Sequence, residues 1–144
     1  MKRKTILFVC VHNSGRSQIA EAFFKQLTKG KFIAYSAGTK PASEINPLII
    51  QVMYESGLDI SKNKPKMLTP EMVHKADSVI TMGCNVVETC PASFFPTEDW
   101  QIIDPEGKTI DEVREIRDII RLRVEKLIKE LGTESSISVK GDMQ

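Results

Sequence analysis

The residues best suited to chemistry lie in one short segment, Cys10-Val11-His12-Asn13-Ser14-Gly15-Arg16-Ser17. A cysteine beside a cation or a helix N-terminus is stabilised as the thiolate, which is the nucleophilic form of its side chain. The guanidinium of Arg16 offers a planar set of donors that matches a tetrahedral oxyanion, and Ser17 can hydrogen-bond the sulfur. The segment therefore predicts a thiolate nucleophile beside an oxyanion-binding loop of residues 11–16, in which His12 faces solvent.

The elements on either side of this loop would position it for such chemistry. Thr5 to Val11 is a continuous β-branched and aromatic run, typical of a strand buried on both faces of a parallel sheet. Ser17 to Lys29 has apolar residues at helical spacing and precedes Gly30, a typical C-terminal cap. A tight turn from strand to helix points several backbone N–H groups and the positive end of the helix dipole at one position.

Alternating strand and helix signals continue along the chain. Strands are expected at 32–37, 78–82 and 100–103, and helices at 46–57, 69–76 and 109–131. This alternation predicts a single three-layer α/β domain with a four-stranded, mostly parallel sheet and helices on both faces. Ligands of such sheets bind beyond the carboxyl ends of the strands, which are expected at Cys10, Ala37, Met82 and Asp104.

Length and charge narrow the classes of function. The chain has 144 residues, so we expect one domain over 1–131, followed by a flexible tail over 132–144 that lacks apolar periodicity. The 20 Lys and Arg balance 19 Asp and Glu, which argues against nucleic acid or an anionic membrane as the main partner. No stretch approaches the roughly 18 apolar residues of a membrane span. Since no signal peptide is evident either, we expect a cytoplasmic protein. A monomer is also expected.

Asp104 is the candidate acid. It is followed by Pro105, which would fix a turn that points the carboxyl group over the anion loop. There it could protonate a leaving oxygen. Without the Cys10 loop, an Asp-Pro pair would indicate no more than a turn.

Two further cysteines, Cys84 and Cys90, lie in the loop after the third expected strand. They are open to three interpretations: two unrelated buried thiols, a zinc site that includes Cys10, or a redox-active pair. A zinc site is poorly supported, because the pair lacks C-x-x-C spacing and only His12 and His74 remain to complete the ligands.

Motifs along the chain resemble a known family. The segment from Phe8 to Phe24, with its C-x5-R-S loop, resembles the low-molecular-weight protein tyrosine phosphatases, and Ser17-Gln18 resembles the arsenate reductases built on that fold. The resemblance covers about residues 4–131 and includes Tyr35-Ser36-Ala37-Gly38, Asn46-Pro47, Thr81-Met82-Gly83-Cys84, Cys90-Pro91, Asp104-Pro105 and Arg117-Asp118. In the tyrosine phosphatases aromatic residues follow the Asp-Pro pair and form a wall for the substrate ring. Glu106 and Gly107 follow it here, which favours a small inorganic oxyanion.

The resemblance implies a role for each candidate residue. Cys10 would be the nucleophile, Arg16 and the loop amides would hold the oxyanion, and Ser17 would support the thiolate. Asp104 would be the general acid. No cofactor would be required, although related reductases bind potassium at residues that match Asn13, Glu21 and Ser36.

A cysteine relay is the hypothesis that uses all three thiols. Cys10 attacks arsenate, Cys84 then attacks the Cys10 sulfur and releases arsenite, and Cys90 attacks Cys84. The final disulfide would be reduced by a thioredoxin-like protein or a low-molecular-weight thiol. Five residues separate Cys84 from Cys90, against six in the best-known thioredoxin-coupled reductases, with Gly83 in the place of the first cysteine, so the order of attack and the reductant stay open. The alternatives are a phosphatase acting on phosphotyrosine or phosphoarginine, and a non-enzymatic arsenite or metal sensor.

Overall fold

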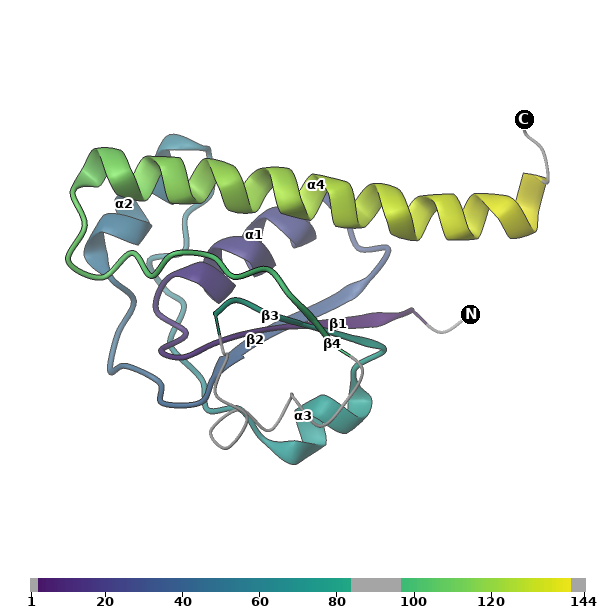
Figure 1. Ribbon diagram of the computed structural model, residues 1–144, viewed down its shortest axis with the longest axis horizontal. Helices are drawn as coiled ribbons and strands as arrows, with labels where there is room; N and C mark the ends of the chain where they lie inside the picture. The colour runs from purple at the N-terminus through teal and green to yellow at the C-terminus, as the bar shows by residue number, and fades with distance from the viewer. Residues whose placement is uncertain (1–2, 84–96, 141–144) are drawn as a thin grey trace.

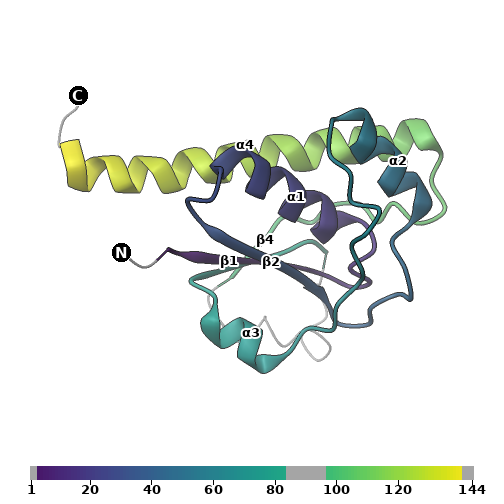
Figure 2. The same cartoon turned by 180° about the vertical axis from the view of Figure 1, so that it is seen from behind.

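The chain folds around a four-stranded parallel sheet with strand order β2-β1-β3-β4. The computed structural model describes the backbone of residues 3–83 and 97–140, and their side chains except at 97 and 133–140. The elements are β1 (Thr5–Cys10), α1 (Arg16–Thr28), β2 (Ile33–Gly38), α2 (Pro47–Glu55), α3 (Pro70–Lys75), β3 (Ser78–Thr81), β4 (Thr97–Asp99) and α4 (Ile110–Lys140). Helices α1, α2 and α4 cover one face and α3 the other, as Figures 1 and 2 show. The predicted three-layer α/β fold is confirmed.

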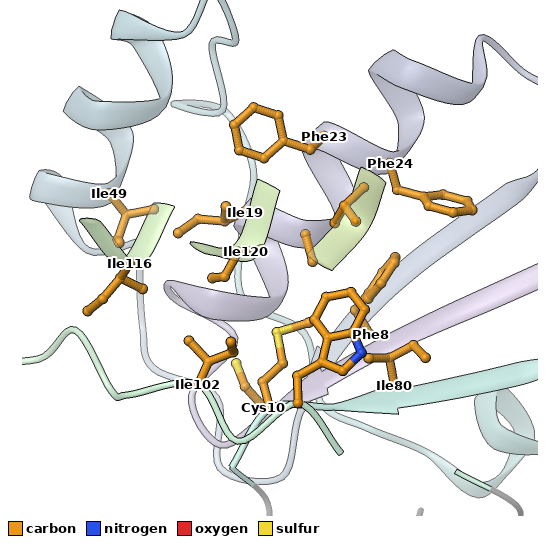
Figure 3. Packing of buried hydrophobic residues seen from close by; sticks show 14 of the residues in the cluster. Phe8, Cys10, Ile19, Phe23, Phe24, Ile49, Ile80, Ile102, Ile116 and Ile120 are labelled. Atoms are coloured by element: carbon orange, nitrogen blue, oxygen red, sulfur yellow. The ribbon is translucent and has the colours of Figure 1, made fainter. Parts of the chain in front are cut away.

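The central strand, β1, carries the core. All six of its residues are buried, because β2 and β3 pair with its two edges and helices cover both of its faces. On the face of the sheet covered by α1, α2 and α4, Phe8 packs against Phe24 of α1, with ring centroids 5.5 Å apart. Ile120 of α4 belongs to the same buried cluster (Figure 3). A continuous apolar run in the sequence is therefore the correct signal for this strand.

Three helices begin at the residues expected from local capping signals. Asn46 Oδ1 accepts a hydrogen bond from the α2 backbone at 2.9 Å, and Thr69 Oγ1 accepts one from α3 at 3.2 Å. Thr109 and Glu112 form a reciprocal capping box at the start of α4, with distances of 2.9 and 3.2 Å.

Two predicted boundaries are wrong. The fourth strand lies at Thr97–Asp99 and not at 100–103. Trp100 and Ile102 are buried, but Gln101 between them has φ +53°, which ends the extended backbone. Helix α4 runs to Lys140, past the predicted end at 131, because Gly132 costs a helix only about 1 kcal/mol and no proline interrupts it. Flexibility of residues 132–144 stays a prediction.

Within residues 3–83 and 97–140, no helix is both long and apolar enough to cross a bilayer.

Candidate active site

The anion loop joins β1 to α1 and turns its peptide N–H groups inward. The carbonyls of Val11, His12 and Ser14 accept backbone hydrogen bonds of 2.8 to 3.0 Å from the segment 40–46. Because a trans peptide holds its C=O and N–H on opposite sides, the N–H groups of residues 12, 13 and 15 point away from that segment. Together with the free N–H groups of the first turn of α1, they form the predicted oxyanion cradle.

Cys10 lies at the base of this cradle. Its sulfur, at the buried end of β1, accepts a hydrogen bond from the N–H of Asn13 at 3.3 Å and lies 2.9 Å from Ser17 Oγ. Asn13 itself adopts the left-handed conformation, with φ +51°. These contacts stabilise a thiolate at the position where a bound oxyanion would meet it.

Arg16 is buried and held in place by the backbone of two other segments. Its Nη1 donates to the carbonyl of Met82 at 2.6 Å and to that of Ile102 at 2.9 Å. Its Nη2 lies 3.9 Å from Asp104 Oδ2. The guanidinium thus has a fixed orientation and a second nitrogen available on the side of Asp104.

Asp104 and the anion loop face each other across one pocket of about 260 Å³. Asp104 is half exposed, and its Oδ1 accepts the N–H of Glu106 at 3.0 Å, so the turn made by Asp104 and Pro105 sets its direction. The pocket is lined by Cys10, His12, Ser14, Gly15, Arg16, Ala42, Asn46, Asp104, Pro105 and Glu106. The structure therefore brings the expected nucleophile, anion-binding arginine and acid together, although Asp104 follows an irregular segment and not a strand end.

The mouth of the pocket is polar. His12 Nδ1 lies 3.1 Å from the carbonyl of Lys40, and His12 Nε2 lies 3.9 Å from Glu106 Oε1. His12, Asp104 and Glu106 each have one possible metal-ligand atom, and these atoms lie within 4.8 Å of one another. Exposed acidic groups commonly lie this close without binding a metal. His12 is half exposed, as expected for a residue at the edge of the loop.

The residues matched to a potassium site have other partners. Ser36 donates to Glu21 at 2.5 Å, but the Glu21 carboxylate also faces two ammonium groups, Lys25 at 2.7 Å and Lys66 at 4.0 Å. Both lone pairs of Asn13 Oδ1 are occupied, by the backbone N–H of Lys66 at 2.8 Å and by a glutamine amide at 3.0 Å. These residues do not fit a potassium ion, because lysines supply the positive charge and protein donors fill the oxygen.

Cys84 and Cys90, the remaining two residues of the proposed relay, lie outside the described residues. Gly83, immediately before Cys84, is described. It has φ +90°, and a Cβ atom at this position would lie 2.6 Å from Arg16 Nη1. A side chain at 83 would therefore require either Arg16 or the backbone at 83 to shift from the observed position.

Sequence reasoning missed two residues that shape the site. Asp99 Oδ1 accepts from Thr81 Oγ1 at 3.0 Å and from the N–H of Gly83 at 3.0 Å, and so holds the turn that follows β3. Gln18 is fully buried and donates to Asn13. The sequence contained one signal for Gln18, its place on the buried side of the expected helix. A buried polar side chain requires hydrogen-bond partners, and here Asn13 is one of them.

Comparison with known proteins agrees with this geometry. A family model described as low molecular weight phosphotyrosine protein phosphatase matches residues 5–137. The chain belongs to this family. Among curated relatives, "Arsenate reductase 2" of Staphylococcus epidermidis is 35% identical over 127 residues, covering 87% of this chain and 96% of the relative. An "Arsenate reductase" of Staphylococcus aureus is 35% identical over 129 residues with the same coverage.

Solved structures include both reductases and phosphatases. A thioredoxin-dependent arsenate reductase of Corynebacterium glutamicum has a TM-score of 0.77 and 38% identity and covers 92% of this chain, which spans 63% of that protein's chain. An arginine phosphatase of Geobacillus stearothermophilus has a TM-score of 0.83 and 26% identity, covering 97% of this chain and 99% of its own. The shared fold thus serves two different reactions.

Proposed function

We propose that this protein reduces arsenate to arsenite, with Cys10 as the nucleophile and Cys84 and Cys90 as the electron-donating dithiol. The observation that carries the proposal is the pocket itself. It joins Cys10, Arg16 and Asp104, and none of the described residues that line it is Phe, Tyr or Trp. Such a pocket suits a small tetrahedral oxyanion better than a phosphotyrosine ring, which gains affinity by stacking. The identity of 35% to proteins named arsenate reductase supports the same substrate.

The first step is a displacement at arsenic. The Cys10 thiolate forms a bond to arsenic(V), and an arsenate oxygen leaves as water after Asp104 donates a proton to it. Arg16 and the loop N–H groups hold the remaining oxygens and neutralise their charge. The buried contacts to Ser17 and Asn13 hold the sulfur in position for attack.

The second step transfers two electrons. The Cys84 thiolate attacks the Cys10 sulfur, a disulfide forms, and the electron pair of the sulfur–arsenic bond stays with arsenic, which leaves as arsenite. Cys90 then attacks Cys84, which frees the Cys10 thiolate and leaves a Cys84–Cys90 disulfide. Disulfide partners need Cα atoms within about 7 Å, so the cysteines must approach one another during the cycle.

The oxidised pair must be reduced from outside the chain. A dithiol protein of the thioredoxin type is the proposed reductant, supported by the thioredoxin-dependent reductase among the structural relatives. A low-molecular-weight thiol is the alternative. Since this chemistry requires thiols that return to the reduced state, we place it in the cytoplasm.

The test compares two reactions in the same set of variants. Wild-type protein and the Cys10→Ser, Cys84→Ser and Cys90→Ser variants are assayed for multiple-turnover arsenate reduction with a thioredoxin system, and for aryl phosphate hydrolysis. Cys10→Ser should lose both reactions. Cys84→Ser and Cys90→Ser should lose arsenate turnover and keep hydrolysis, which serves as the internal control for folding and anion binding.

Mass spectrometry sharpens this test. In Cys90→Ser the relay should stop after one arsenite per chain and leave a Cys10–Cys84 disulfide. Full arsenate turnover by both Cys84→Ser and Cys90→Ser would show that the three-cysteine relay is wrong.

A phosphatase activity is the second candidate, because it needs only the thiolate, Arg16 and Asp104, which the pocket already joins. Phosphate and arsenate have nearly the same charge and shape, so a phosphocysteine could form at Cys10 and be hydrolysed by water. The similarity to an arginine phosphatase favours phosphoarginine over phosphotyrosine as the protein substrate. Rapid hydrolysis of phosphoarginine, with arsenate oxidising no thiols, would make this the main activity.

A further inference from the structure

A chain of buried hydrogen bonds leads to the sulfur of Cys10. Gln18, Asn13 and Ser17 are fully buried polar residues. Gln18 Nε2 lies 3.0 Å from Asn13 Oδ1, Asn13 Nδ2 lies 2.6 Å from Ser17 Oγ, and Ser17 Oγ lies 2.9 Å from Cys10 Sγ. Buried polar side chains persist in folded proteins when their partners satisfy them, so these four groups depend on one another.

The direction of this chain is fixed by one backbone group. The N–H of Lys66 lies 2.8 Å from the amide of Asn13, and a backbone N–H can only donate, so the Asn13 oxygen must face Lys66. The Asn13 NH₂ group therefore faces Ser17 and donates to its oxygen. The hydroxyl hydrogen of Ser17 is then available for the sulfur of Cys10, and this arrangement favours a thiolate, which accepts hydrogen bonds and does not donate them.

Gln18 holds Asn13 at two points. Its amide nitrogen lies within hydrogen-bond distance of the main-chain oxygen of Asn13, at 3.2 Å, and of the side-chain oxygen. Its Oε1 accepts from Asn63 Nδ2 at 3.1 Å, and its nitrogen also lies 3.4 Å from the carbonyl of Lys64. Asn13 has φ +51°, in the left-handed region that asparagine adopts more readily than most residues, and the bonds from Gln18 tie its main chain and side chain together there.

We propose that Gln18 is a positioning residue for the Cys10 thiolate. By holding Asn13 between α1 and the segment 63–66, Gln18 keeps the Asn13 amide aimed at Ser17 and thereby keeps the hydroxyl of Ser17 aimed at the sulfur. The proposal concerns the nucleophile alone. It holds whether the thiolate attacks arsenate or a phosphate ester, so its test uses neither.

The experiment measures how fast iodoacetamide alkylates Cys10 at pH 4 to 10, with mass spectrometry of the peptide that contains Cys10. Gln18→Met keeps the size of the side chain and removes its donor and acceptor. We expect the midpoint of the pH–rate profile to rise by about one pH unit, and the rate well below the midpoint to fall about tenfold, with an unchanged plateau at high pH. Asn63→Ala changes an exposed residue and removes its hydrogen bond to Gln18 Oε1. It should raise the midpoint by less than Gln18→Met does.

Thr28→Val is the matched control. Thr28 is buried at the other end of α1, where its hydroxyl donates to the carbonyl of Phe24 at 2.7 Å. The control should lower thermal stability and leave the midpoint unchanged, which separates positioning of the thiolate from general loss of packing. A Gln18→Met profile that coincides with wild type would overturn the proposal. If Gln18→Met does not fold, Asn63→Ala decides: a raised midpoint supports the proposal and an unmoved midpoint overturns it.

Discussion

Gly83 is the position where one added methyl group should disrupt the anion site. Its φ is +90°, and a Cβ would lie 2.6 Å from Arg16 Nη1 and 3.4 Å from the carbonyl oxygen of Ile102. Arg16 cannot move aside freely, because the same nitrogen donates to Met82 at 2.6 Å and to Ile102 at 2.9 Å. Gly83→Ala should therefore displace either the guanidinium or the end of β3.

The size of the effect follows from two contributions. An L-residue in the left-handed region costs about 1 to 2 kcal/mol. Loss of one hydrogen bond from the Arg16 guanidinium costs about 1.5 to 3 kcal/mol. Gly83→Ala should thus lower the free energy of unfolding by about 2.5 to 5 kcal/mol. The displaced guanidinium should also weaken phosphate binding at least about tenfold, which corresponds to about 1.4 kcal/mol.

Gly57→Ala is the control for backbone strain alone. Gly57 has φ +84° and no atom within 4 Å of the position that a Cβ would take. Urea unfolding of the two variants separates strain from the clash, and calorimetric titration with phosphate measures the anion site. Equal losses of stability in both variants, with phosphate affinity unchanged in Gly83→Ala, would show that a Cβ at 83 does not displace Arg16.

Three further predictions test the acid, an ionic contact and the core. Asp104→Asn should slow arsenate reduction at least about 100-fold while phosphate still binds; an unchanged rate would remove Asp104 as the proton donor. Hydrogen bonding to Arg114 lowers the pKa of Glu55, so Glu55 adds stability that is present above its unfolded-state pKa and lost as pH falls through its folded-state pKa. Glu55→Gln should therefore reduce the acid-range change in stability seen in urea unfolding, and an unchanged pH dependence would contradict this. Ile120→Ala should lower stability by about 2 to 5 kcal/mol in thermal unfolding, whereas Ile119→Ala, on the exposed side of α4, should change it by about 0.5 kcal/mol or less.

Features that depend on neighbouring residues could be predicted from the sequence. The apolar run that forms β1 and the capping residues Asn46, Thr69 and Thr109 all appear in the structure where expected. Each of these signals acts within one strand or one helical turn, so the linear pattern contains it in full. The anion loop between β1 and α1 was predicted for the same reason.

Features that depend on distant contacts could not be predicted. The alternation around Trp100 and Ile102 resembles a strand, but the positive φ of Gln101 makes that segment irregular, and a single sequence does not show this. The lone pair on Asn13 that a cation would need is filled by Lys66, which lies 53 residues away along the chain. Only the folded structure brings such donors together.

Arg16 links the two halves of the proposed reaction. Its Nη1 is bonded to Met82, two residues before Cys84, while its Nη2 faces Asp104 across the pocket. An oxyanion bound at Nη2 would therefore contact the same side chain whose Nη1 holds the backbone that leads to the second cysteine. Gly83 lies beside Arg16 at the end of that segment, where a Cβ would lie 2.6 Å from Arg16 Nη1. One buried residue thus contacts both the anion pocket and the backbone two residues before Cys84.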